Sequence, residues 1–244
     1  MMRGRVAARP LADIADAACQ VFADKGFRSA GISDVAAALG LSHGALYTYV
    51  ESKQALLHLA LLRALRPGEV DILTLPVAAV APHRLTEMFD SWIADQAGLP
   101  ILAQSAARLS DRPVEQELGE IIDELYEFID RNRQVLDLVE WCASELPELA
   151  QTYFVQRRRA MLEQLGEFLQ SRIHARRLQP VPDVGAAARF VVETIAWFAM
   201  HRHGDPDSAM LGDLSSRTTV RHLLMAAFVP AAQPGPATRG RRHR

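Results

Sequence analysis

The chain has 244 residues, of which 49% are hydrophobic, so it can bury the core of one large domain or of two smaller ones. Its net charge of −2 is unevenly spread: residues 1–66 carry 8 Lys and Arg against 5 Asp and Glu, residues 67–229 carry 15 against 24, and residues 230–244 carry 4 against none. The sequence has no apolar run of about 18 residues and only two cysteines, so we expect a cytoplasmic protein with no membrane segment and two buried free thiols.

The chain begins with a basic arm that contains Arg3, Arg5 and Arg9. Such an arm is either a frayed terminus or a segment that meets phosphate or enters a minor groove. Apolar residues at helical spacing then predict a helix from Leu11 to Lys25. We expect this helix to stop at Gly26, because glycine readily adopts the left-handed conformation that ends a helix.

The stretch from residue 32 to residue 53 has the pattern of a helix-turn-helix. A first helix is predicted from about Ser33 to Leu39, and a second begins after Ser42, which is a good N-cap residue. Two sharply crossing helices need a small contact residue, a residue that tolerates the αL conformation and an apolar anchor, which here are Ala36, Gly40 and Leu46. An ordinary helical hairpin would need the same three residues.

The outer face of the second helix carries two phenols and an imidazole that packing does not require. Residues early on such a helix suit contacts with base edges, whereas tyrosine hydroxyls, a helix N-terminus and lysine are common donors to phosphate oxygens. We therefore predict a surface for double-stranded operator DNA that comprises Ser33, Ser42, His43, Gly44, Ala45, Tyr47, Tyr49 and Lys53.

Over about the first 65 residues, the chain resembles the TetR-type transcriptional repressors. The resemblance rests on Phe-Ala-Asp-Lys-Gly-Phe at residues 22–27, Gly-Ala-Leu-Tyr at residues 44–47 and Ser-Lys-Gln-Ala-Leu-Leu at residues 52–57. Two positions depart from the family pattern. Gly31 stands where a Thr or Ser that caps the helix and touches phosphate is usual, and Val50 replaces a Phe. The resemblance implies a homodimer.

A helix from Ser52 to about Leu65 is apolar almost all round, so we expect it to be covered by both the DNA-binding head and the body. The predicted domains are a helix-turn-helix DNA-binding domain over residues 1–66, a helical effector-binding and dimerisation domain over residues 67–229, and a disordered basic tail over residues 230–244. From Arg84 onward the pattern is helical throughout. The predicted fold is thus all-α, with a three-helix helix-turn-helix domain before a C-terminal helical bundle.

Within the body, a long helix is expected from about Pro147 to Arg177. Its three consecutive arginines, at positions 157–159, are either a phosphate site or a solvated face that pairs with Glu163 and Glu167, and we favour the solvated face. Aromatic residues of the body are either plain core or the lining of a site for a small apolar or aromatic effector. The candidates for this site are Phe89, Trp92, Tyr126, Trp141, Tyr153 and Phe154.

Two helices near the C-terminus, over residues 184–200 and about 215–228, each have a broad apolar face. Two such helices from each of two chains make a four-helix interface, which the resemblance also implies. The residues predicted at this dimer seam are Val191, Ile195, Phe198, Leu224 and Phe228. The linker between the helices carries His201, His203 and Asp205, at a spacing that suits either a mobile loop or a metal site.

The favoured function is a ligand-responsive repressor that binds a palindromic operator as a homodimer and is released by its effector. The alternative is a DNA-binding dimer without an effector. We expect no cofactor, no metal and no enzymatic activity, because the sequence lacks a nucleophile elbow, a di-metal carboxylate set, a His-Glu-x-x-His motif and a phosphate loop.

Overall fold

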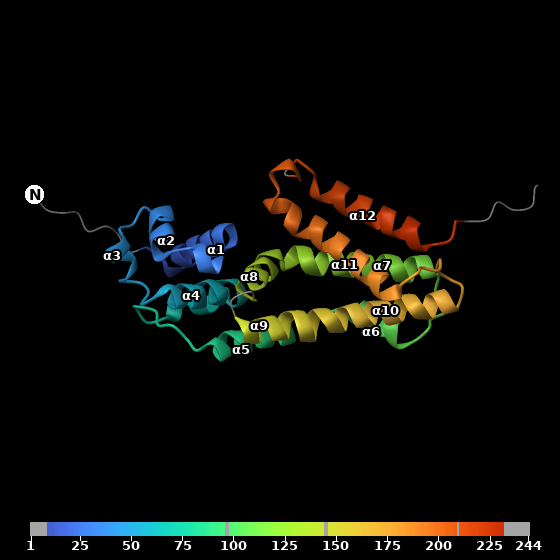
Figure 1. The fold of residues 1–244 in the computed structure, drawn as a ribbon, viewed down its shortest axis with the longest axis horizontal. Helices are drawn as coiled ribbons and strands as arrows, with labels where there is room; N and C mark the ends of the chain where they lie inside the picture. Colours follow the sequence, from blue (N-terminus) through green and yellow to red (C-terminus); the bar gives the residue numbers. More distant parts are fainter. Residues whose placement is uncertain (1–8, 96–97, 144–145, 209, 232–244) are drawn as a thin grey trace, which may run out of the picture.

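The computed structural model describes residues 9–95, 98–143, 146–208 and 210–231, and it shows an elongated assembly of helices (Figure 1). The α-helices are α1 (Leu11–Ser29), α2 (Ile32–Ala38), α3 (His43–Leu46), α4 (Lys53–Leu65), α5 (Pro82–Asp95), α6 (Pro100–Ala107), α7 (Val114–Arg131), α8 (Arg133–Ala143), α9 (Pro147–Ala150), α10 (Arg159–His174), α11 (Val184–Ala199) and α12 (Asp213–Phe228). Short 3₁₀ segments are η1 (Pro67–Ile72), η3 (His201–Gly204) and η4 (Pro206–Ser208), and η2 (Gln151–Arg158) is a π-helix.

The predicted all-α fold is confirmed, because no strand occurs in the described part of the chain. An isolated β-bridge pairs Val50 with Val77, so the loop before α5 lies against the end of the helix-turn-helix. The expectations for the basic arm and for the end of the basic tail fall on residues 1–8 and 232–244, which lie outside the described residues.

Helices α1 to α4 form one end of the molecule, which we call the head; the remaining helices are the body (Figure 1). The head closes over fully buried apolar side chains such as Phe22, Leu46 and Leu59. Gly26 has φ 73° and breaks α1 where the sequence predicted a stop, although one further turn continues to Ser29. Glycine permits this φ without strain.

Helix α4 belongs to the core of both parts. Its Leu59 and Leu62 lie in one hydrophobic cluster with Phe89 of α5 and Val139 of α8. The prediction that this helix contacts head and body is therefore confirmed. The division of the chain at residue 66 stays a prediction, since the same apolar cluster extends across that point.

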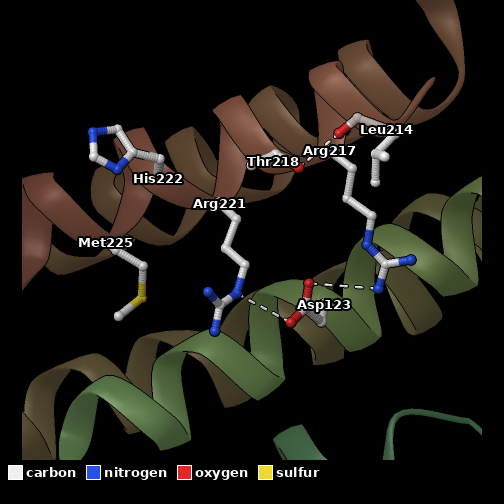
Figure 2. A pocket seen from close by; sticks show the side chains of 7 residues that line it. All are labelled: Asp123, Leu214, Arg217, Thr218, Arg221, His222 and Met225. Carbon is white, nitrogen blue, oxygen red and sulfur yellow. Dashed lines mark hydrogen bonds and ion pairs between the residues drawn. The ribbon is translucent and has the colours of Figure 1, made fainter. Parts of the chain in front are cut away.

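The body has a second hydrophobic cluster, which α6, α7, α10, α11 and α12 enclose. Helix α12 is fastened to α7 by Asp123, whose carboxylate lies 3.4 Å from Arg217 and 3.1 Å from Arg221 (Figure 2). The shared carboxylate holds both arginines against α7, so α12 is fixed to the body by charge as well as by apolar burial.

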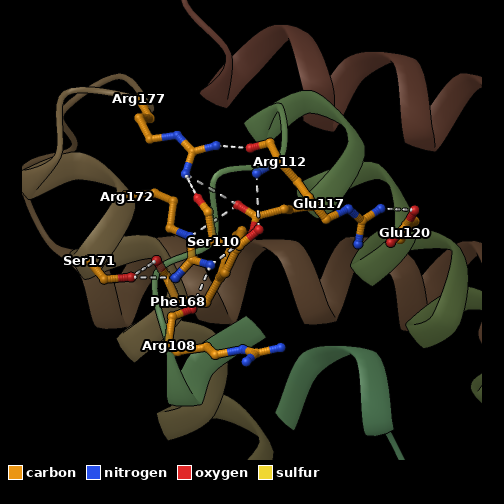
Figure 3. Close-up of polar contacts among 9 residues, drawn as sticks. All are labelled: Arg108, Ser110, Arg112, Glu117, Glu120, Phe168, Ser171, Arg172 and Arg177. Carbon is orange, nitrogen blue, oxygen red and sulfur yellow. Dashed lines mark hydrogen bonds and ion pairs between the residues drawn. The ribbon is translucent and has the colours of Figure 1, made fainter. Parts of the chain in front are cut away.

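The end of the body that is remote from the head contains a buried ion pair (Figures 1 and 3). Arg172 of α10 is fully buried, and its Nε and Nη2 atoms donate to Glu117 of α7 over 3.2 and 3.0 Å. Arg172 also donates to the carbonyl of Arg108, and Arg177 donates to the carbonyls of Ser110 and Arg112. These bonds join α7 and α10 to the loop between α6 and α7.

The long helix predicted from Pro147 is present as a nearly continuous rod made of α9, η2 and α10, which ends at His174. The expected solvated pairing was wrong for Arg158, which is only 17% exposed and lies 2.5 Å from Glu193 of α11. Each π-turn contains an extra residue, so the helical positions that face the core change along the segment. Arg157 also points elsewhere than expected and pairs with Asp90.

The second helix of the helix-turn-helix is shorter than predicted. Only His43–Leu46 is α-helical, and the chain then tightens, with Thr48 N donating to Ala45 O over 3.2 Å and Tyr49 N donating to Leu46 O over 2.9 Å. These i to i+3 bonds are typical of the last turn of a helix. The segment from Ser42 to Tyr49, which we call the recognition segment, is therefore about two turns long and ends at the bridge residue Val50.

Both cysteines are free thiols, as expected, with Cys142 buried and Cys19 partly buried. Burial raises the pKa of each thiol to about 12. No three His, Cys, Asp or Glu side chains gather closely enough to hold a metal ion within the described ranges, so the spacing of His201, His203 and Asp205 does not form a metal site. Within the same ranges no helix is both long and apolar enough to span a membrane.

Candidate functional site

The turn between α2 and α3 has the geometry that the sequence predicted. Gly40 has φ 65°, and the carbonyl of Ala36 accepts from Leu41 N over 2.8 Å. Ala36 and Leu46 are buried at the crossing of the two helices. A small residue, a left-handed glycine and an apolar anchor thus fix the angle between α2 and α3.

The N-terminus of α2 is capped from within the helix. Gly31 has no side chain to offer, but its backbone N–H donates to the Asp34 carboxylate over 2.7 Å. The same carboxylate accepts from Lys25 over 2.8 Å, which ties α2 to α1. The ammonium of Lys25 and the Gly31 N–H hold the pKa of Asp34 below its usual range. Asp34 therefore replaces part of the cap that Gly31 lacks.

One side of the recognition segment faces solvent. The exposed residues are Ser42, His43, Gly44, Tyr47 and Thr48. The rings of His43 and Tyr47 meet edge to face at 5.1 Å, so they present one continuous polar and aromatic surface. Thr48 was not among the predicted residues, although its place between two tyrosines could have indicated it. Ser33 is also exposed and stands at the start of α2.

Three of the predicted DNA-binding residues have polar atoms that already have a partner. Ala45 N donates to the Ser42 hydroxyl over 3.1 Å, which is the N-cap bond of α3. The Tyr49 hydroxyl accepts from Arg9 N over 2.9 Å, and the basic arm precedes Arg9. Lys53 Nζ donates to the carbonyl of Arg28 over 3.0 Å and lies 4.5 Å from the centre of the Phe27 ring.

These contacts give Lys53 a structural role in addition to the predicted contact with phosphate. Its ammonium satisfies a carbonyl at the end of α1, and the ring of Phe27 adds a cation–π interaction. Sequence reasoning missed this contact because the two partners are 25 residues apart. Among the described residues, His43 and Tyr47 have no such internal partner beyond their mutual ring contact. The exposed side of the segment from His43 to Tyr47 is therefore the better candidate for direct contact with DNA.

The predicted effector residues do not gather at one place. Four of them form a row in the order Trp92, Phe89, Tyr153 and Phe154, in which successive ring centres are 5.7, 6.0 and 4.8 Å apart. Tyr126 lies in the other hydrophobic cluster and donates to the carbonyl of Phe198, whereas Trp141 is 45% exposed on α8. Only the first four could therefore line a common site.

Polar groups lie at one end of this aromatic row. The hydroxyl of Tyr153 donates to Glu140 of α8 over 2.9 Å. Burial, together with the nearby Glu140 carboxylate, raises the pKa of Tyr153 far above its usual value. Arg158 stands 4.0 Å from Glu140, and His201 lies 3.8 Å from it. The π-helix thus places aromatic and charged side chains together, as π-turns at functional sites often do.

Four of the five predicted seam residues are covered within their own chain. Val191, Ile195, Leu224 and Phe228 are buried, and Phe198 is partly buried. The large apolar side chains that α11 and α12 expose are different ones: Phe190 is 56% exposed, Trp197 37% and Leu223 60%, and Leu214 at the start of α12 is 79% exposed. A second chain could contact these exposed residues, whereas the four buried ones stabilise the fold of one chain.

The comparisons with known proteins agree with this geometry. Residues 14–60 match the family described as "Bacterial regulatory proteins, tetR family", which confirms the resemblance. No curated protein sequence matches the chain. The matched region contains most of α1, all of α2 and α3, and the first part of α4, so it covers the whole helix-turn-helix.

Several solved structures share the fold over nearly the whole chain. A bacterial regulatory protein in the tetR family from Rhodococcus RHA1 has a TM-score of 0.52 at 18% identity and covers 92% of this chain and 100% of its own. The ketosteroid transcriptional regulator KstR2 of Mycobacterium tuberculosis has a TM-score of 0.51 at 16% identity, with 93% and 98% covered. AibR in complex with isovaleryl coenzyme A and operator DNA has a TM-score of 0.50 at 15% identity, with 90% and 100% covered.

Proposed function

We propose that this chain, whose residues 14–60 match the tetR family of bacterial regulatory proteins, is a ligand-responsive repressor that binds a palindromic operator as a homodimer. The observation that carries the proposal is the exposed surface of the recognition segment, where His43 and Tyr47 form one face in front of a buried anchor, Leu46. In a dimer, two such segments would enter successive major grooves about 34 to 36 Å apart.

We assign base contacts to Ser42, His43 and Gly44, because they begin the helix and are exposed. Tyr47 and Ser33 are placed to meet phosphates on either side. Tyr49 and Lys53 have internal partners, so their contribution to DNA binding includes positioning the arm and the end of α1. The head extends over residues 1–66 and the regulatory body over residues 67–229 in this proposal.

The proposed dimer contact lies on the outer face of α11 and α12. Phe190, Trp197 and Leu223 are large apolar side chains that remain exposed on these adjacent helices. Burial of such side chains against a second copy would stabilise the dimer at about 25 cal/mol for each Å² removed from water. One head alone makes too few contacts for specific binding, so dimerisation is needed for operator recognition.

The proposed effector site is the aromatic row of α5 and η2 with the polar groups around Glu140. An apolar or aromatic ligand would pack beside Tyr153 and Phe154, and Arg158 or Glu140 would orient its polar end. The similar structures support an effector by analogy, since one is a ketosteroid transcriptional regulator and another is a complex with isovaleryl coenzyme A. Those ligands belong to those proteins.

A second function, DNA binding without an effector, is favoured by the burial of Phe89 and Trp92, which contribute to the core of the chain. A thermal-shift screen of small apolar and aromatic molecules separates the two functions. A ligand-gated protein gains stability from its effector, by about 2.7 kcal/mol at a hundred times the dissociation constant. A screen without any stabilising compound would favour the effector-free regulator.

Selection of binding sites from random duplex DNA tests the proposed function as a whole. The expected result is a palindrome whose half-sites are about 10 base pairs apart. The same selection with His43→Ala should lose preference at one or two positions in each half-site, because a good base contact contributes about 1 to 3 kcal/mol of discrimination. A selection that enriches no sequence would overturn the proposal.

A further inference from the structure

A groove of about 1100 Å³ separates the head from the body on the side of α1. The head contributes residues of α1 and α4 to its lining, and the body contributes residues of α8 and of the segment around η3. None of the aromatic row at Phe89 and Tyr153 lines this groove, but the groove and the effector site proposed above meet at His201, which lines the groove and lies 3.8 Å from Glu140. Grooves between two structural units are common places for small-molecule sites.

One side of this head–body groove is apolar and aromatic. Trp141, Leu138 and Met200 line it from the body, and Ala23 and Ala64 line it from the head. Trp141 is 45% exposed, although indole rings are usually well covered. Its ring lies close to the backbone of Gly26, since a Cβ atom at Gly26 would be 3.8 Å from the ring. The groove therefore presents an indole surface at the point where α1 is kinked.

Carboxylates outnumber arginines on the rest of the groove wall, which also carries His201 and His203. The carboxylates are Asp16, Asp24, Asp137 and Asp205, and the arginines are Arg63 and Arg133. Both arginines already have partners, because Arg63 bonds Asp16 over 2.9 Å and Arg133 bonds Asp130 over 3.0 Å. Three carboxylates of the groove thus have no arginine of the groove to neutralise them, and the local charge is negative.

Asp137 is one of the two partly buried carboxylates of the groove, whereas Asp16 and Asp24 are exposed. It accepts a hydrogen bond from Trp141 and faces His201, and in the described part of the chain it has no ion pair with Lys or Arg. Partial burial raises the pKa of Asp137 above its ordinary value. A carboxylate that is held away from water without a cationic partner is stabilised by any cation that enters beside it.

We propose that the head–body groove binds a small organic cation, with its charged group at Asp137 and its apolar or aromatic part against Trp141. An ammonium group beside an indole gains a cation–π interaction, and the neighbouring carboxylate adds a charge-assisted hydrogen bond. Neutral apolar molecules lack both interactions, and anions meet the negative wall. Ligand charge therefore decides what the groove accepts.

Binding in this groove would also favour one arrangement of the head relative to the body, because α1 and α8 both line it. An effect on operator affinity rests on the proposed function, whereas binding of the cation does not. If a probe binds the groove but operator affinity is unchanged, the result supports the ligand site and refutes only the coupling between this site and DNA binding.

Three probes with one apolar part and different charges test the proposal: 4-phenylbutylammonium, 4-phenylbutanol and 4-phenylbutyrate. Isothermal titration calorimetry with the full chain should give the tightest binding for the ammonium, at least about tenfold tighter than for the alcohol, and the weakest for the carboxylate. The Trp141 fluorescence should change when the ammonium binds. Equal affinities, no binding of the ammonium, or tighter binding of the carboxylate would overturn the proposal.

Variants place the binding in the groove. Asp137→Asn keeps an acceptor for Trp141 and should weaken the ammonium about tenfold or more while leaving the alcohol unchanged. The matched control is Asp111→Asn, which removes one exposed carboxylate in the loop between α6 and α7 and should change nothing. If both variants bind the ammonium like the wild type, with circular dichroism confirming that they are folded, the cation does not bind at Asp137.

Discussion

Replacement of Arg172 by Met tests how the far end of the body is stabilised. Arg172 is fully buried, and Glu117 beside it is 2% exposed, so neither charge can recover its solvation from water. After the substitution, the one ion pair left to Glu117 within the described residues is that with Arg177, which is 3.8 Å away. Loss of one partner of a buried ion pair costs about 3 to 5 kcal/mol, and we expect a value near 3 because Arg177 remains.

The assay is urea unfolding followed by circular dichroism. Arg112→Met is the matched control, because Arg112 pairs with Glu120 in the same corner but both side chains are about half exposed (Figure 3). An exposed pair contributes about 0 to 1 kcal/mol. The double variant Arg172→Met with Glu117→Leu should recover most of the lost stability, since no buried charge is left without a partner. Equal costs for Arg172→Met and Arg112→Met would refute this reasoning, as would a double variant less stable than Arg172→Met.

Four further substitutions test the head and the dimer seam. Phe190→Glu on the exposed face of α11 should give folded monomers that no longer bind the operator, whereas Ile195→Glu should unfold the chain because the Ile195 side chain is fully buried. If light scattering shows that Phe190→Glu is still a dimer, Phe190 is not part of the dimer contact. Lys53→Met should lower the free energy of unfolding by about 1 to 2 kcal/mol, because a charged hydrogen bond is lost. It should also make the salt dependence of DNA binding shallower by about one phosphate contact per subunit. An unchanged melting temperature would contradict the role of Lys53 at the end of α1. Asp34→Asn should destabilise the protein at neutral pH but not in strong acid. The pKa of Asp34 is lowered in the folded chain, so its ionised form stabilises the fold above the ordinary carboxylate pKa, and this stabilisation is lost as the pH falls through the lowered pKa. A difference in stability between the variant and the wild type that persists at low pH would contradict this expectation.

Local features of the fold were predictable from the sequence. Glycine at 26 and 40 and serine at 42 and 52 act through their own backbone or through a residue three positions away. Such contacts depend on residue type and short spacing, which a single sequence displays. The helix-turn-helix and its exposed face follow from the same kind of signal.

Contacts between distant helices were not predictable in the same way. Helix α11 is apolar on nearly all sides, so its pattern did not indicate that Val191 and Ile195 face the chain's own core and Phe190 faces outward. The partner of Lys53 is 25 residues away, and Glu117 is 55 residues from Arg172. Periodicity identifies a buried face but not the helix that covers it.

The proposed function depends most on contact between DNA and the exposed surface that His43 and Tyr47 form. The most direct test is fluorescence anisotropy of the wild type and of the double variant His43→Ala with Tyr47→Ala, on the selected operator and on a scrambled duplex of equal length. Each lost contact costs about 1 to 3 kcal/mol and occurs twice in a dimer, so preference for the operator should fall about a hundredfold or more. The control His174→Ala, an exposed residue of the body, should keep that preference. If the double variant melts at the same temperature as the wild type and prefers the operator over the scrambled duplex as strongly as the wild type does, His43 and Tyr47 do not recognise the operator.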